Sequence, residues 1–115
     1  MRKQERRLNP RIDQNLPISV VTNGYDFVTN THNISCLGAY CTIDKYVPPF
    51  TKVRIKLNLP LSKNGVRENC DVNCTGVVVR SEDDPNGKFN VAIFFNEIKD
   101  QPRQKIAQYI KQFVG

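Results

Sequence analysis

Residues 52–59 alternate without interruption between apolar and polar side chains, and this period of two constrains the fold more than any other feature. The apolar positions are Val53, Ile55, Leu57 and Leu59, and the polar positions are Lys52, Arg54, Lys56 and Asn58. Successive side chains of a β-strand point to opposite faces, so the pattern predicts a strand with one buried and one wet face. Phe89, Val91, Ile93 and Phe95 repeat the pattern near the C-terminus. A fold rich in half-buried strands is therefore expected.

Four further strands are predicted from stretches rich in β-branched and aromatic residues, bounded by turn signals. They cover residues 17–22, 25–34, 39–43 and 70–80. Asn23-Gly24 lies between the first two and is a strong signal for a two-residue hairpin turn. Asp84-Pro85-Asn86-Gly87 marks a second turn, directly before the last strand.

Two places in this pattern are expected to be irregular. Pro60 should end the strand over 52–59, with an exposed loop over 62–69 around Asn64-Gly65. Gly76 coincides with a change in the alternation of the following strand, which indicates a bulge or a sharp bend. The predicted inward positions there are Cys70, Val72 and Cys74 before the glycine, and Val77 and Val79 after it.

The C-terminal residues have helical periodicity. Asp100 can cap a helix and Pro102 suits its first turn. The apolar positions at helical spacing are Ile106, Tyr109, Ile110 and Phe113. With 115 residues the chain has the length of one domain. The prediction is an all-β fold with one C-terminal helix: six antiparallel strands in a closed or nearly closed barrel.

Charge and hydropathy limit the cellular location and the partners that can be expected. The net charge of +6 favours anionic partners without naming one. The charged N-terminus lacks the apolar stretch of a signal peptide, and the longest apolar run, residues 91–95, is far too short to cross a bilayer. We therefore expect no membrane insertion, a cytoplasmic location and four reduced cysteines.

Two short motifs provide candidate binding residues. Arg7 and Arg11 stand four residues apart in a polar segment, and Asn33, Ser35 and Gly38 follow where one strand is expected to end and the next to begin. Guanidinium groups match phosphate oxygens bidentately and stack on aromatic rings. Together the motifs describe a clamp for an anionic, planar, hydrogen-bonding ligand, and a guanine nucleotide has both kinds of surface.

In these motifs, R-x-x-x-R followed by [D/N]-x-S-x-x-G, the chain resembles the PilZ domain family of bacterial cyclic di-GMP receptors. The resemblance runs from about Glu5 to Phe113. It implies a six-stranded barrel with a helix packed across it, cyclic di-GMP as ligand with no cofactor, and no enzymatic activity. In the family, the residue at the position of Arg6 is associated with the number of bound dinucleotides, and an arginine is compatible with a stacked pair.

The resemblance also implies roles for the motif residues. Arg7 and Arg11 are expected to contact phosphate and guanine, and Asn33 to accept from guanine N1–H or N2–H. Ser35 is expected to donate to a phosphate or hold the turn, and Gly38 to permit a tight turn or a close backbone approach.

The chain is accordingly divided into a flexible basic arm over residues 1–15 and a barrel with its helix over residues 16–115. The arm is too polar to fold alone, and ligand is expected to order it over the barrel. This ordering would change the surface offered to an unidentified effector protein. By resemblance, the outputs include motility, biofilm formation, exopolysaccharide production and virulence.

Three alternatives remain open. The chain can be a PilZ-like adaptor that does not bind ligand. It can be a basic barrel for single-stranded nucleic acid, with its site on Lys52, Arg54 and Lys56, although the sequence shows no ladder of exposed aromatic residues for base stacking. A third alternative is a zinc site on the four cysteines.

The cysteine spacing, Cys36-x4-Cys41 and Cys70-x3-Cys74, is not that of the usual zinc knuckles, and the sequence does not favour a metal. An enzyme is favoured least. His32 is the only histidine, and nothing orients it toward Cys36 as a catalytic dyad.

Overall fold

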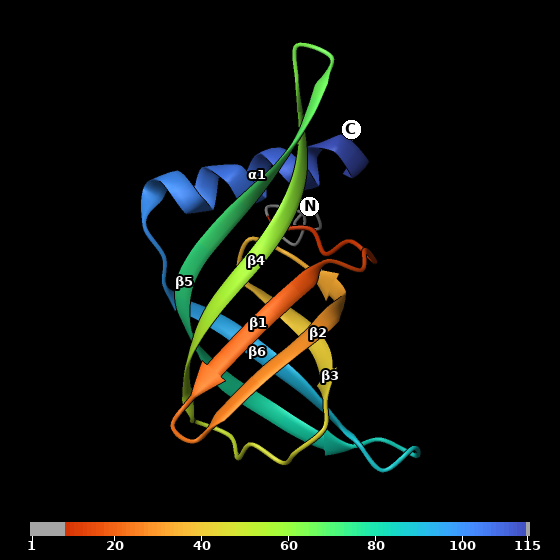
Figure 1. The fold of residues 1–115 in the computed structure, drawn as a ribbon, viewed down its shortest axis with the longest axis vertical. Helices are drawn as coiled ribbons and strands as arrows, with labels where there is room; N and C mark the ends of the chain where they lie inside the picture. The colour runs from red at the N-terminus through yellow and green to blue at the C-terminus, as the bar shows by residue number, and fades with distance from the viewer. Residues whose placement is uncertain (1–8, 115) are drawn as a thin grey trace, which may run out of the picture.

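The computed structural model describes residues 9–114, which form six strands and one helix. The elements are β1 (Pro17–Thr22), β2 (Tyr25–Ile34), β3 (Gly38–Ile43), β4 (Lys52–Lys63), β5 (Val66–Asp83), β6 (Phe89–Glu97) and α1 (Asp100–Val114). All strand pairs are antiparallel, and they close a barrel in the order β1-β2-β3-β6-β5-β4 (Figure 1). The predicted fold class is confirmed.

The interior of the barrel is made by the alternating positions of the strands. In β4 the four predicted apolar side chains are buried, and in β6 three of the four are buried while Phe89 is half-buried. Fully burying a side chain of this size stabilises the fold by about 1.5–3 kcal/mol. The period of two thus predicted the inward face of both strands correctly.

Helix α1 closes one end of the barrel and packs against β4 and β5 (Figure 1). Ile106, Tyr109 and Ile110 are buried against it, as predicted, whereas Phe113 is about half exposed in the last turn. Within residues 9–114, no helix combines the length and the apolar character that a bilayer crossing requires.

Both predicted hairpin turns are present. Thr22 pairs with Tyr25 around Asn23-Gly24, and Gly24 has a φ of 88°, a conformation that glycine adopts without strain. In the second turn the amide of Asp84 donates to the carbonyl of Lys88 at 2.9 Å.

The prediction that Pro60 ends the strand was wrong. Strand β4 continues to Lys63 and pairs with β5 throughout, so residues 62–69 form a hairpin that projects past α1 (Figure 1). Strand β1 pairs with β4 only as far as Leu57, so Pro60 lies where β4 has β5 as its one partner. Proline is tolerated on such an edge because its missing N–H can face the open side.

The predicted change of alternation in β5 was also wrong. Val72, Gly76 and Val78 are buried, so the inward positions keep one parity through the glycine, while Val79 is about half exposed. Val77 is only half-buried. Three consecutive valines do not reveal which one faces the core.

Gly76 instead occupies an inward position where a side chain would not fit. A Cβ atom there would lie 2.7 Å from Cδ1 of Ile55 and 2.8 Å from Cγ2 of Ile93. The expected irregularity does occur in the pairing of β5 with β6, which shifts register between Thr75 and Val77 and again between Val78 and Arg80. The bulge prediction is confirmed, and the parity prediction is not.

Candidate ligand-binding site

The structure brings the two sequence motifs into direct contact. The guanidinium Nη1 of Arg11 donates to the side-chain carbonyl Oδ1 of Asn33 at 2.7 Å, across 22 residues of sequence. Arg6 and Arg7, the other predicted arginines, lie outside the residues that the structure describes. We call the group formed by Arg11, Asn33, Ser35 and Gly38 the motif corner.

Arg11 is positioned by the residue that follows it. The amide of Ile12 donates to the carbonyl of Ile34 at 2.9 Å, and the amide of Ile34 donates back to the carbonyl of Ile12 at 3.0 Å. The side chain of Ile12 is buried in the core. The backbone at Arg11 is therefore fastened to the end of β2, beside Asn33.

Thr31 strengthens this attachment, and sequence reasoning missed it. Its hydroxyl, fully buried, donates to the carbonyl of Gln14 at 2.6 Å and accepts from the amide of Leu16 at 2.9 Å. The Asn15 side chain also donates to the carbonyl of Thr31 at 2.7 Å. A threonine at an inward strand position was the available signal, because a buried hydroxyl needs partners.

Ser35 holds the turn between β2 and β3. Its Oγ accepts from the amide of Leu37 at 3.1 Å, and its own amide donates to the carbonyl of Gly38 at 2.9 Å. The residue is almost completely buried. Of the two roles expected for Ser35, the structure shows the one that stabilises the turn.

Gly38 permits the close backbone approach that was expected of it. A Cβ atom at this position would lie only 2.1 Å from the carbonyl oxygen of Ile93 in β6. The amide of Phe95 donates to the carbonyl of Leu37 at 2.8 Å, so a backbone hydrogen bond joins the motif turn to β6. Any other residue at position 38 would push this turn away from β6.

The surface beside Asn33 extends across three more strands. Asn33 pairs with Tyr40, Tyr40 with Ala92, and Ala92 with Arg80, so these residues form one row across the outer face. Tyr40 and Ala92 are half-buried and Arg80 is exposed. Arg80 contacts Glu82 at 3.5 Å, and such an exposed pair is weak enough for Arg80 to turn toward another anion.

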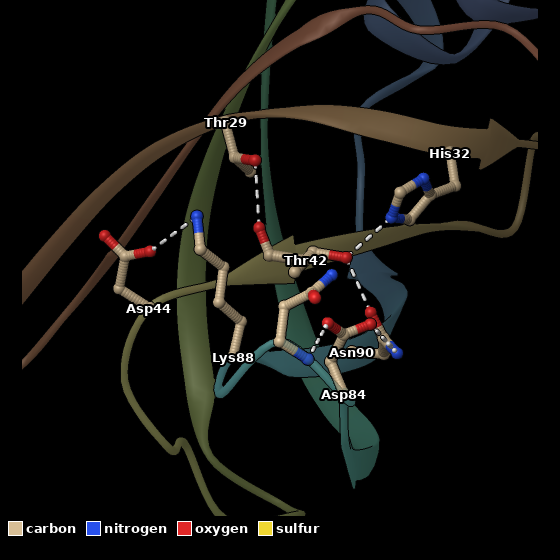
Figure 2. Close-up of polar contacts among 8 residues, drawn as sticks. Thr29, His32, Thr42, Asp44, Asp84, Lys88 and Asn90 are labelled. Atoms are coloured by element: carbon tan, nitrogen blue, oxygen red, sulfur yellow. Dashed lines mark hydrogen bonds and ion pairs between the residues drawn. The ribbon is translucent and has the colours of Figure 1, made fainter.

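A chain of hydrogen bonds crosses the same face, from His32 through Thr42 and Asn90 to Asp84 (Figure 2). The Asp84 carboxylate can only accept, so Asn90 donates to it from Nδ2 at 3.2 Å and presents Oδ1 to Thr42. Thr42 then donates to Asn90 at 2.6 Å and accepts from Nε2 of His32 at 2.6 Å. His32 is therefore held by Thr42, with its ring 5.8 Å from that of Tyr40.

Comparison with known proteins agrees with this geometry. The family model described as PilZ domain matches residues 5–112. The chain belongs to the PilZ domain family. Its fold is similar to that of the inhibitor of motility MotI/DgrA from Bacillus subtilis, with a TM-score of 0.80 and 21% identity over 97% of this chain and 51% of that one. The chain thus spans about half the length of that protein. No curated protein matches the sequence.

The motif corner consists of residues from the two sequence motifs by which the chain resembles this family. PilZ domains are receptor or adaptor domains, and proteins of the family bind cyclic di-GMP as a ligand. Arg11, Asn33, Ser35 and Gly38 are the motif residues that the structure describes, and the first two contact each other.

The cysteines of this PilZ domain do not gather around a common point. Among residues 9–114, no group of three His, Cys, Asp or Glu side chains is placed to hold a metal ion. Burial raises the pKa of the Cys41 thiol to about 12 and that of Cys74 to about 11, and burial also raises the pKa of Cys36, against the opposing charge of Arg103. Zinc binds thiolates, so these environments disfavour the zinc alternative.

Proposed function

We propose that this chain is a receptor for cyclic di-GMP that performs no chemistry and passes the signal to an effector protein. The ligand would bind at the motif corner, between the arginines of the N-terminal arm and the outer face of β2, β3 and β6. The contact between Arg11 and Asn33 carries this proposal, because a guanidinium that can bond phosphate or guanine lies beside an amide that can accept from guanine.

The corner retains binding capacity beyond this contact. A guanidinium has five N–H donors, and the contact with Asn33 uses one of them. The carbonyl of Asn33 has two lone pairs, so it can accept from guanine N1–H while it still faces Arg11. Beyond them, the row continues through Tyr40 and the small Ala92 to the exposed Arg80, and the dinucleotide would lie along this row.

Any ligand-dependent movement of the arm is proposed for residues 1–11. Residues 12–15 are hydrogen-bonded to the barrel through the backbone of Ile12 and the hydroxyl of Thr31. Their attachment sets the point from which Arg6, Arg7 and Arg11 would close over the dinucleotide. This closure would change the surface that an effector protein meets.

The cellular output would be motility, biofilm formation or exopolysaccharide production. The fold neighbour from Bacillus subtilis is named an inhibitor of motility, which makes motility the first output to measure. The second candidate function is that of an adaptor that keeps the PilZ barrel and does not bind the dinucleotide.

Calorimetric titration with cyclic di-GMP separates these functions. The wild type should bind with micromolar or better affinity, and Arg7→Ala combined with Arg11→Ala should weaken binding by about a hundred-fold or more, because each charge-assisted hydrogen bond contributes about 1.5–3 kcal/mol. The matched control is Arg2→Ala combined with Lys3→Ala, which removes the same charge outside the motif and should leave affinity nearly unchanged. A stoichiometry of two that falls to one in Arg6→Ala would assign Arg6 to a stacked ligand pair.

An absence of heat and of binding in the wild type would overturn the receptor proposal. The adaptor without ligand would then be the better description. Equal weakening in the motif variant and in its control would mean that general basic charge, rather than the motif corner, attracts the dinucleotide.

A further inference from the structure

A cleft of about 920 Å³ lies on the outer face of β1, β4 and β5, where the segment between β6 and α1 passes over it. Four basic side chains line it: Arg54, Lys56, Lys99 and Arg103. We call this the basic cleft. It contains none of the residues of the motif corner.

Strand register explains why two of the cations stand in the cleft. Lys56 lies between Ser19 of β1 and Asn73 of β5, and both neighbours also line the cleft. Arg54 lies two residues before Lys56 on the same face of β4, and both cations are exposed because the alternate residues of β4 fill the barrel core. Arg54 and Lys56 therefore project from a rigid strand that is paired on both sides.

The other two cations come from the chain after β6. Lys99 directly precedes α1, and Arg103 lies in its first turn, where its guanidinium donates to the carbonyl of Ile98 at 3.4 Å. This segment thereby faces the β4 cations across the cleft with two more positive charges.

The positive charge of the cleft is not neutralised by the described chain. Within residues 9–114 the ion pairs are Arg80 with Glu82 and Lys88 with Asp44, and both lie elsewhere. Glu97 is the one carboxylate among the residues that line the cleft. Side chains two residues apart on a strand stand about 7 Å from each other, within the Debye length of about 8 Å at physiological salt. Their mutual repulsion would be relieved by a bound anion.

The same cleft has an apolar part. Val21 and Ile98 line it and are half-buried, so they offer a surface for an apolar side chain. None of the lining residues is aromatic. Sites for single-stranded nucleic acid rely on aromatic platforms for base stacking. The lack of aromatic residues and the presence of an apolar part favour a polypeptide over a nucleic acid.

We propose that the basic cleft docks an acidic segment of a partner protein. Its carboxylates pair with the four cations, and an apolar side chain between them rests on Val21 and Ile98. The cleft shares no lining residue with the motif corner, but the two are neighbours: β1 lines the cleft and pairs with β2, and the charge of Arg103 acts on Cys36 of the motif turn. The docking test therefore uses the protein without cyclic di-GMP.

The test uses a fluorescein-labelled synthetic peptide in which single Leu residues alternate with pairs of Glu, and follows its anisotropy on titration with the full chain. The wild type should bind it saturably, and Arg54→Glu combined with Lys56→Glu should weaken binding by at least about ten-fold. The matched control, Lys63→Glu combined with Lys111→Glu, makes the same change in net charge at exposed positions outside the cleft and should bind normally.

Two further measurements complete the test. Arg54→Gln combined with Lys56→Gln removes the cations without adding carboxylates, and it should also weaken binding. This variant replaces the charge-reversed pair if that pair does not fold. A peptide with Gln in place of Glu should not bind. No binding by the wild type, or equal loss in the cleft and control variants, would overturn the proposal. Tighter binding of a labelled oligothymidylate than of the acidic peptide would assign the cleft to nucleic acid instead.

Discussion

The motif corner and the basic cleft both present arginines to solvent, but the protein supports them in different ways. At the corner, Arg11 contacts Asn33, and buried backbone and hydroxyl groups fasten the neighbouring residues. In the cleft, Arg54 and Lys56 project from a regular strand, and no carboxylate of residues 9–114 pairs with them. The first is a site of defined geometry, and the second is a surface of concentrated charge.

This difference indicates different kinds of recognition. A defined set of donors and acceptors selects a ligand whose own acceptors and donors match it in position. A concentration of like charge attracts any complementary segment and tolerates variation in its sequence. This difference agrees with the two proposals, a small molecule of fixed structure at the corner and a polypeptide in the cleft. It also follows that substitutions at the corner should cost stability and substitutions in the cleft should not.

The largest loss of stability is expected for Gly38→Ala. The added Cβ would lie 2.1 Å from a backbone oxygen of β6, which cannot move without opening the ladder between β3 and β6. We expect a loss of more than about 3 kcal/mol in the free energy of unfolding, measured by urea denaturation.

Gly65→Ala is the control for this substitution. Its φ of 80° strains an alanine, but nothing lies within 4 Å of the added atom. The expected cost is about 1–2 kcal/mol. If Gly38→Ala costs no more than Gly65→Ala, the close approach between the motif turn and β6 does not support the corner.

An intermediate loss is expected for Thr31→Val. Valine keeps the volume but removes the hydroxyl that serves both Gln14 and Leu16, so a buried amide and a carbonyl lose their partner. The cost should be about 1–3 kcal/mol by urea denaturation. Thr29→Val is the control, because the Thr29 hydroxyl makes one bond, to the carbonyl of Thr42, and the residue is half-buried. Equal costs for the two variants would show that Thr31 does not fasten the arm.

The strands of the fold were predictable because period two is a direct consequence of strand geometry. Residues 52–59 and 89–95 alternate clearly, and both proved to be strands with the expected inward face. The hairpin over 60–69 was missed because a proline and polar side chains normally indicate a loop. Whether β4 may contain Pro60 depends on its lacking a second partner there, which sequence does not reveal.

The candidate site likewise contains some residues that the sequence predicted and others that only the fold brings together. Arg11, Asn33, Ser35 and Gly38 were predicted because they form motifs in linear sequence. Tyr40, Ala92 and Arg80 were not, because only the register of β2, β3, β6 and β5 places them in one row with Asn33. Likewise, Lys52, Arg54 and Lys56 were noted as a solvated strand face, but the meeting of Arg54 and Lys56 with Lys99 and Arg103 depends on where α1 begins.

The smallest effect on stability is expected for Arg54→Gln combined with Lys56→Gln. The two cations are exposed, and Gln keeps most of the side-chain volume, so the free energy of unfolding should stay within about 0.5 kcal/mol of wild type. A small gain is expected at low salt, where repulsion between the cations is strongest, and this gain should vanish at high salt.

Urea denaturation at two salt concentrations measures this, with Lys63→Gln combined with Lys111→Gln as the control, since these lysines lie outside the cleft. The cleft pair should gain more at low salt than the control pair, because its charges are closer together and share the surface with Lys99 and Arg103. A loss of more than about 1 kcal/mol would show that the cleft cations stabilise the fold. The contrast between a structurally supported corner and an uncompensated cleft would then be wrong.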